Sequence, residues 1–186
     1  MKRTFIAVKL EAGEDLTDAI SSLKAELRHE IIRWVEISNM HITLAFIGNT
    51  EEPMIKKVGK MLENDLAGTD KFEFDLTGFG VFRNISDPRI IFTGIVNPGK
   101  LIEAHEIVKK GLEELDIKLE KRQFKPHLTI GRIKDLRDKS TLQRLILKYS
   151  GVVLQTVKVS EIIYYESVLL PAGLLYKSIS TSGLLK

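Results

Sequence analysis

The chain has 186 residues and a formal net charge of +3, and its length fits one domain of roughly 100–200 residues. Because the chain contains no cysteine, disulfides, thiol catalysis and cysteine-ligated zinc are excluded. No run of apolar residues reaches the roughly 18 that a membrane span needs. The apolar stretch at the N-terminus is short and is broken by Lys9, which favours a first strand over a signal peptide. We therefore expect a cytoplasmic, monomeric protein.

The spacing of apolar residues predicts strands and helices that alternate along the chain. The predicted elements, in chain order, are a strand over 4–10, a helix over 13–28, a strand over 39–48, a helix over 51–66, strands over 72–80 and 90–96, a helix over 99–114, a strand over 124–133, a helix over 137–152, and strands over 158–166 and 174–181. The last two strands are expected to form a hairpin around Pro171, Ala172 and Gly173.

The predicted elements repeat once along the chain. His41 and His127 stand 86 positions apart (127 minus 41), and this offset brings strand onto strand and helix onto helix. We therefore predict two units of the form strand–helix–strand–helix–strand, at approximately 4–80 and 90–166. Duplicated units commonly pack about a pseudo-twofold axis, so the two histidines are expected to meet across a central cleft.

Each histidine belongs to a His-x-Thr motif in a predicted strand. Because side chains alternate between the two faces of a strand, His41 and Thr43 are expected to share one face, and His127 and Thr129 another. Alternation assigns Phe46 to the opposite, buried face of its strand. Both strands can therefore cover an apolar row with helices and present histidine and threonine to the cleft.

Two imidazoles and two hydroxyls fit a general acid and a general base acting on a phosphate. An unperturbed histidine has a pKa near 6.5, so one ring can be protonated while the other is neutral. Threonine hydroxyls can donate hydrogen bonds to phosphate oxygens. Zinc asks for three or four protein ligands, which two histidines do not supply, so we expect neither a metal nor another cofactor. A serine–histidine–aspartate triad and two ordinary core histidines are the remaining readings.

Further residues near the motifs allow simpler interpretations. His29 follows a predicted helix, and His105 within another is expected to be solvated. Phe82 is a candidate for the rim of the cleft.

Basic side chains beside Phe124 suit a nucleic-acid strand, with cations for phosphates and a ring for a base. These basic residues, which can also form an ordinary solvated face, are Lys118, Lys121, Arg122 and Lys125.

The segments "HITLAFIG" and "FKPHLTIGR", together with "RTFIAVKL" at the start, resemble the two-histidine phosphoesterase superfamily. Within it they are similar to the RNA 2′,3′-cyclic phosphodiesterases, also called 2′-5′ RNA ligases. This resemblance covers essentially the whole chain. It implies a bilobal α+β fold in which two mostly antiparallel sheets surround a central cleft, with helices on the outside.

The resemblance also implies an activity and residue roles. A 2′,3′-cyclic phosphate at an RNA end, such as that of a tRNA half, would be hydrolysed to a 2′-phosphate, or joined to a 5′-hydroxyl by a 2′-5′ linkage. His41 would donate a proton and His127 would accept one, whereas the symmetry of the motifs alone leaves the order open. Thr43 and Thr129 would bind the phosphate.

Arg132 matches a basic residue that such proteins use near the phosphate. Strict alternation turns it away from His127, unless a bulge at Gly131 returns it.

Two other functions share the same motifs. The substrate can be a small cyclic nucleotide or a cyclic phosphate of ADP-ribose, instead of an RNA end. The protein can also be a non-catalytic module that binds RNA ends. The intact histidine and threonine in both motifs favour catalysis, and the basic residues before His127 favour RNA.

Overall fold

The computed structural model describes residues 1–120, 123–171 and 173–185. Its helices are α1 (Glu14–Glu26), α2 (Glu52–Asp65), α3 (Gly99–Glu114) and α4 (Lys139–Lys148), with a 3₁₀ turn at Ile37–Asn39. Its strands are β1 (Lys2–Lys9), β2 (Ile31–Trp34), β3 (His41–Thr50), β4 (Phe72–Phe82), β5 (Ile90–Val96), β6 (Leu128–Asp135), β7 (Val153–Val159), β8 (Glu161–Leu170) and β9 (Gly173–Gly183).

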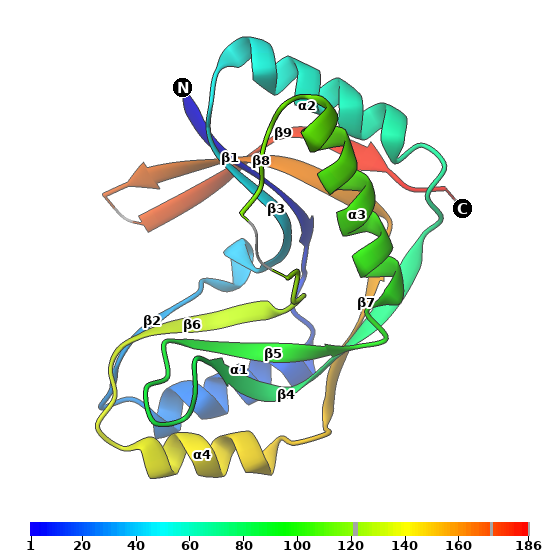
Figure 1. The fold of residues 1–186 in the computed structure, drawn as a ribbon. Coiled ribbons are helices and arrows are strands. Elements are labelled where there is room, and N and C mark those ends of the chain that lie inside the picture. The colour runs from blue at the N-terminus through cyan, green and yellow to red at the C-terminus, as the bar shows by residue number, and fades with distance from the viewer. Residues whose placement is uncertain (121–122, 172, 186) are drawn as a thin grey trace.

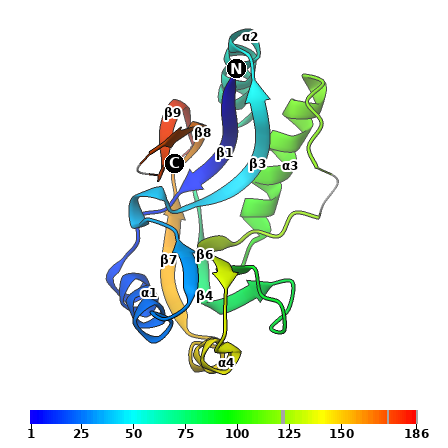
Figure 2. The ribbon, with the colours of Figure 1, turned by 90° about the vertical axis from the view of Figure 1, so that its left-hand side faces the viewer.

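The strands form two antiparallel sheets. The first sheet has the order β3-β1-β8-β9, and the second has the order β2-β6-β5-β4-β7. In Figure 1, α2 and α3 lie with the first sheet, whereas α1 and α4 lie with the second at the bottom of the view. The quarter turn of Figure 2 shows the same division, with one helix pair at each end of the molecule. The predicted bilobal α+β fold with outer helices is confirmed.

The two sheets share one plan. At the offset of 86 positions, β1, β3 and β4 correspond to β5, β6 and β8. The order β3-β1-β8 in the first sheet therefore matches β6-β5-β4 in the second. Each sheet takes its third strand from the other half of the chain, since β8 pairs with β1 and β4 pairs with β5. Neither sheet can be completed by one half of the chain alone.

The helices follow the same exchange. α1 comes from the first half of the chain but contacts β7 of the second sheet, and α3 comes from the second half but contacts β3 of the first. Their apolar faces are buried, as the spacing predicted: Leu16, Ile20 and Leu23 on α1 and Leu101 and Val108 on α3 are at most 2% exposed. Burial of these apolar faces fixes each helix on the outside of a sheet.

Two strands were not predicted, and some predicted elements were too long, among them the helix over 137–152, which the structure shows as α4 over Lys139–Lys148. β2 lies at one edge of the second sheet and β7 at the other. The predicted strand 158–166 spans the end of β7 and most of β8, while the predicted last strand 174–181 lies within β9. The strand predicted over 124–133 begins only at Leu128, so His127 stands immediately before it. Of the predicted turn residues, Ala172 lies outside the described residues.

The prediction that His105 is solvated was wrong. Its side chain is 9% exposed, and its Nδ1 lies 2.8 Å from the carbonyl oxygen of Leu44, to which it donates. Its ring also stacks on Phe124, with centroids 3.9 Å apart. His105 therefore connects α3 both to β3, which carries the first His-x-Thr motif, and to the segment that leads to the second.

Candidate active site

The two His-x-Thr motifs line a single cleft of about 320 Å³. All five residues predicted for the site, His41, Thr43, His127, Thr129 and Arg132, belong to its lining. The motifs come from β3 in the first sheet and from the start of β6 in the second, so the cleft lies between the sheets. The structure therefore brings together the residues that the offset of 86 positions relates.

The two imidazole rings are held by the same hydrogen bond. Nδ1 of His41 lies 2.7 Å from the carbonyl oxygen of Asn39, and Nδ1 of His127 lies 2.7 Å from that of Lys125. Because a carbonyl oxygen only accepts, each Nδ1 carries the proton and donates. Nε2 of a neutral ring is then a free proton acceptor, and Nε2 of a protonated ring is a donor. Both rings are thus set up to exchange a proton through Nε2.

Aromatic side chains support both rings. The His41 ring centroid lies 5.0 Å from those of Phe5 and Tyr176. The His127 ring centroid lies 4.6 Å from that of Phe82, whose ring contacts His127 edge to face. Phe82 was a candidate for the rim of the cleft, whereas sequence reasoning did not identify Phe5 or Tyr176. Only their alternation within apolar strands could have indicated them, and that pattern describes an ordinary core equally well.

Burial and positive charge lower the pKa of both histidines. For His41, burial is the largest cause, the bond to the Asn39 carbonyl opposes it, and the charges of Arg132 and His127 add to the lowering. For His127, burial again leads, the bond to the Lys125 carbonyl opposes it, and Arg132 lowers the pKa further. Both groups therefore favour the neutral form more than free histidine does, until an anion enters the cleft.

A bulge turns Arg132 toward the cleft. Between β5 and β6, Ile91 pairs with Gly131 and Phe92 pairs with Thr129, which leaves Ile130 as the extra residue. The extra residue reverses the alternation after Thr129, so the exposed Arg132 side chain points to the side of the motif. A bulge therefore returns Arg132 to the side of His127, although the extra residue is Ile130 and not Gly131.

The equivalent bulge in β3 makes the prediction for Phe46 wrong. Ile6 pairs with Ala45 and Ala7 pairs with Thr43, which leaves Leu44 as the extra residue. Phe46 is consequently 48% exposed and was not found in the core. Because the alternation is reversed at the bulge, its side chain shares a face with Thr43.

Two segments complete the walls of the cleft, and sequence analysis identified neither. β2 contributes Arg33 and Trp34 and pairs with β6, with Trp34 opposite Gly131. The start of β9 contributes Leu174 and Tyr176 to the opposite wall. An amide N–H of Asn39 donates to the carbonyl oxygen of Leu174 over 2.9 Å, which ties this hairpin to the turn before His41.

The basic segment before His127 does not form the cleft wall in the part of the chain that the structure describes. Lys118 and Lys125 are exposed, and neither belongs to the cleft lining. Lys121 and Arg122 lie outside the described residues. The contribution of this segment to binding RNA stays a prediction.

Neither a metal cluster nor a membrane-spanning helix is found among residues 1–120, 123–171 and 173–185. There, no three side chains of histidine, aspartate or glutamate gather closely enough to hold a metal ion. Every helix in this part of the chain is too short or too polar to cross a membrane. Among the described residues, Glu36 is an acidic residue of the cleft lining, whereas the charges that shift the pKa of the two histidines are those of Arg132 and, for His41, of His127.

Known proteins are similar to this chain in sequence. A model of the 2′-5′ RNA ligase superfamily matches residues 13–164. A Methanothermobacter thermautotrophicus protein named RNA 2′,3′-cyclic phosphodiesterase is 32% identical over 94% of each chain. A Methanocaldococcus jannaschii protein of the same name is 32% identical over 95% of this chain and 98% of its own.

Solved structures share the fold. E. coli LigT complexed with 3′-AMP has a TM-score of 0.78 at 20% identity, and the match covers 100% of this chain and 99% of that one. At this identity the likeness is one of fold. The sequence match over most of the chain, together with the paired motifs in one cleft, leads to a single family assignment: the protein belongs to the 2′-5′ RNA ligase superfamily.

Proposed function

We propose that this protein is an RNA 2′,3′-cyclic phosphodiesterase, which hydrolyses the cyclic phosphate at an RNA 3′ end to a 2′-phosphate without a metal ion. The observation that carries the proposal is the pair of histidines whose Nδ1 atoms are both engaged by carbonyl oxygens, so that both Nε2 atoms are free in one cleft. The names of the relatives supply the substrate class.

In the proposed reaction, each proton moves through a histidine Nε2. His127 accepts a proton from a water molecule as the water oxygen attacks phosphorus. The bond between phosphorus and the 3′ oxygen breaks, and His41 donates a proton to that oxygen. After turnover His127 is protonated and His41 is neutral, and exchange with solvent restores the starting state. The order of the two roles follows the family resemblance, because the hydrogen bonds of the two rings are alike.

Three side chains are proposed to hold the phosphate during this step. The hydroxyls of Thr43 and Thr129 donate to its non-bridging oxygens, and the Arg132 guanidinium neutralises its charge. The negative phosphate also opposes the effect of Arg132 on the histidines, so the pKa of each ring rises when substrate binds. That rise provides the protonated ring which the free protein disfavours.

The reverse type of reaction uses the same groups. A 5′-hydroxyl in place of water would be joined to the cyclic phosphate through a 2′-5′ linkage, with His127 accepting the hydroxyl proton. We propose hydrolysis as the main activity because water is always present at high concentration. RNA ends such as those of tRNA halves are the proposed substrates, acted on by a cytoplasmic monomer.

Product analysis tests this function directly. A dinucleotide with a 2′,3′-cyclic phosphate, incubated with the protein and a chelator, is expected to give only the 2′-phosphate. The same assay with a 3′,5′-cyclic nucleotide is expected to give no product. Hydrolysis of small cyclic phosphates but not of the dinucleotide would favour the small-molecule reading. Tight binding of the dinucleotide without turnover would favour the non-catalytic module, and a need for metal would contradict the proposal.

A further inference from the structure

An exposed aromatic ring lies on the cleft face of the first sheet, outside the lining of the cleft. Phe46 on β3 pairs with Phe5 on β1, and side chains of paired residues in antiparallel strands share a face. Phe5 in turn contacts the ring of His41, with centroids 5.0 Å apart. Phe46 therefore lies on the same face as the first motif, and its side chain remains 48% exposed.

Arg3 completes this surface. Its guanidinium carbon lies 5.0 Å from the centroid of the Phe46 ring. We call these two residues the Phe46–Arg3 platform. Burial raises the pKa of Tyr176 in the cleft wall, and the charges of Arg132 and Arg3 oppose that rise. The platform is thus close enough to the cleft for its charge to act on a residue of the cleft wall.

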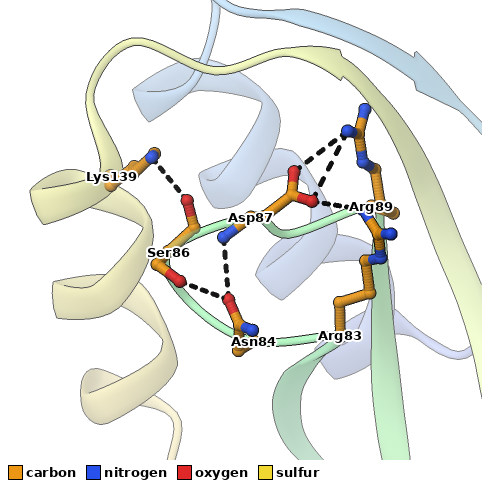
Figure 3. A network of polar contacts seen from close by, with 6 residues as sticks. All are labelled: Arg83, Asn84, Ser86, Asp87, Arg89 and Lys139. Carbon is orange, nitrogen blue, oxygen red and sulfur yellow. Dashed lines mark hydrogen bonds and ion pairs between the residues drawn. The ribbon is translucent and has the colours of Figure 1, made fainter.

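The guanidinium of Arg3 is available to an anion. Within the described residues, the guanidinium of Arg3 makes a cation–π contact with the Phe46 ring, and no carboxylate forms an ion pair with it. Figure 3 shows the contrasting case in the β4–β5 loop, where Arg83 and Arg89 both pair with Asp87. An exposed ring beside an unpaired guanidinium provides a stacking surface for a base and donors for a phosphate.

We propose that the Phe46–Arg3 platform binds the nucleotide that precedes the terminal one in the RNA substrate, with its base stacked on the platform and a phosphate beside Arg3. This inference rests on the proposed function, because it places the terminal cyclic phosphate between the two histidines. The spacing agrees: Ala7 and Phe5, the partners of Thr43 and Phe46, are two residues apart on β1, or about 7 Å along a strand. One nucleotide unit spans that distance.

The test compares two substrates that differ by one base. Both are dinucleotides with a terminal 2′,3′-cyclic phosphate, and one lacks the base of its first nucleotide. For the unmodified protein, kcat/KM is expected to be about 5- to 160-fold higher with the intact dinucleotide, the range that base–aromatic stacking gives. Phe46→Ala is expected to abolish this preference, and Phe46→Tyr to retain it because the ring is kept.

A matched control is Leu147→Ala, which truncates an exposed apolar side chain on α4, with the second sheet. It should leave the preference unchanged. A preference that survives in Phe46→Ala would overturn the proposal, and so would the absence of any preference in the unmodified protein. Equal losses on both substrates leave the preference intact and count against the platform in the same way. If the unmodified protein hydrolyses neither dinucleotide, the proposed function itself fails and the platform falls with it.

Discussion

At the scale of single residues, the two histidines are nearly interchangeable in the free protein. Each donates through Nδ1 to a carbonyl oxygen two positions earlier, and each has its pKa lowered mainly by burial. A reaction that needs one protonated ring is therefore favoured on the acidic side of the ordinary histidine pKa of about 6.5. Below the lower of the two pKa values the base is lost, and above the higher the acid is lost.

Arg132 should control the position of this pH profile. Since its charge lowers the pKa of both histidines, Arg132→Gln should raise both values and move both limbs of kcat/KM to higher pH. The unmodified protein should show a bell centred below about pH 6.5. The measurement is kcat/KM against pH with a dinucleotide cyclic phosphate.

Arg132→Lys is the control for this prediction, because it keeps the positive charge. Its profile should stay near that of the unmodified protein, although its activity falls with the loss of the guanidinium geometry. Limbs that stay in place in Arg132→Gln would mean that Arg132 does not act on the two rings.

The sequence predicted which residue types form the site better than it predicted the orientation of their side chains. A histidine and a threonine on one face are unusual in an apolar strand. Because this motif occurs twice at the offset of 86 positions, the two motifs were predicted to form one site. The carbonyl oxygens that orient both rings belong to the backbone and have no sequence signature. Strict alternation predicted that Phe46 and Arg132 point away from the face of their motifs. This was wrong because a one-residue bulge reverses the alternation without changing the composition of the strand.

At the scale of elements, the two bulges explain features that the periodicity did not predict. The carbonyl oxygen of each extra residue needs a hydrogen-bond donor from outside its normal pairing. For Ile130 the donor is the backbone N–H of Val35, just after β2, over 2.9 Å. For Leu44, on the edge strand β3, the donor is Nδ1 of His105 over 2.8 Å. In the first sheet, a histidine of α3 thus supplies the hydrogen-bond donor that the backbone after β2 supplies in the second sheet.

His105→Ala should therefore destabilise the protein. It leaves the Leu44 carbonyl without its donor, which costs about 1–3 kcal/mol for a buried group, and it removes the stacking on Phe124. Unfolding in urea measures the loss. His105→Asn, which keeps an N–H donor, should recover part of it, and His29→Ala at an exposed position should have no effect. Equal stability of His105→Ala and the unmodified protein would contradict this role.

Gly131 should be needed for the contact between β2 and β6. A Cβ atom there would lie 3.0 Å from Cγ2 of Ile32 and 3.1 Å from Cε3 of Trp34. Gly131→Ala is expected to displace β2 at a cost of about 1–3 kcal/mol, and to raise KM because β2 carries cleft residues. Gly183→Ala, with no atom within 4 Å, is the matched control. Urea unfolding and KM that match those of the control would contradict the expected displacement.

The missed strands have a physical explanation at this scale. β2 has only four residues, with alternating exposed and half-buried side chains, and its pattern is too short to separate from a loop. Its position depends on Gly131, which is nearly 100 residues away in the chain. The long helices were predicted because an apolar face repeated over several turns is a strong pattern, and α3 was predicted with its exact bounds.

At the scale of the whole molecule, the cleft exists because the two halves of the chain exchange elements. Strands β4 and β8 and helices α1 and α3 each lie against the sheet that contains the other half's histidine strand. The histidines therefore face each other from sheets that neither half completes alone. The duplication predicted two related halves and this pseudo-twofold fold, but not which sheet each element joins. The unit bounds of 4–80 and 90–166 stay a prediction.

The most direct test of the paired histidines uses a cyclic phosphate with sulfur in place of the bridging 3′ oxygen, a leaving group that needs no proton. With the ordinary oxygen substrate, His41→Ala and His127→Ala should each lower the rate by about 10²–10⁴-fold. With the sulfur substrate, His41→Ala should approach the rate of the unmodified protein, while His127→Ala should stay slow. An unchanged rate for either variant on the oxygen substrate, or no recovery of His41→Ala on the sulfur substrate, would contradict the account.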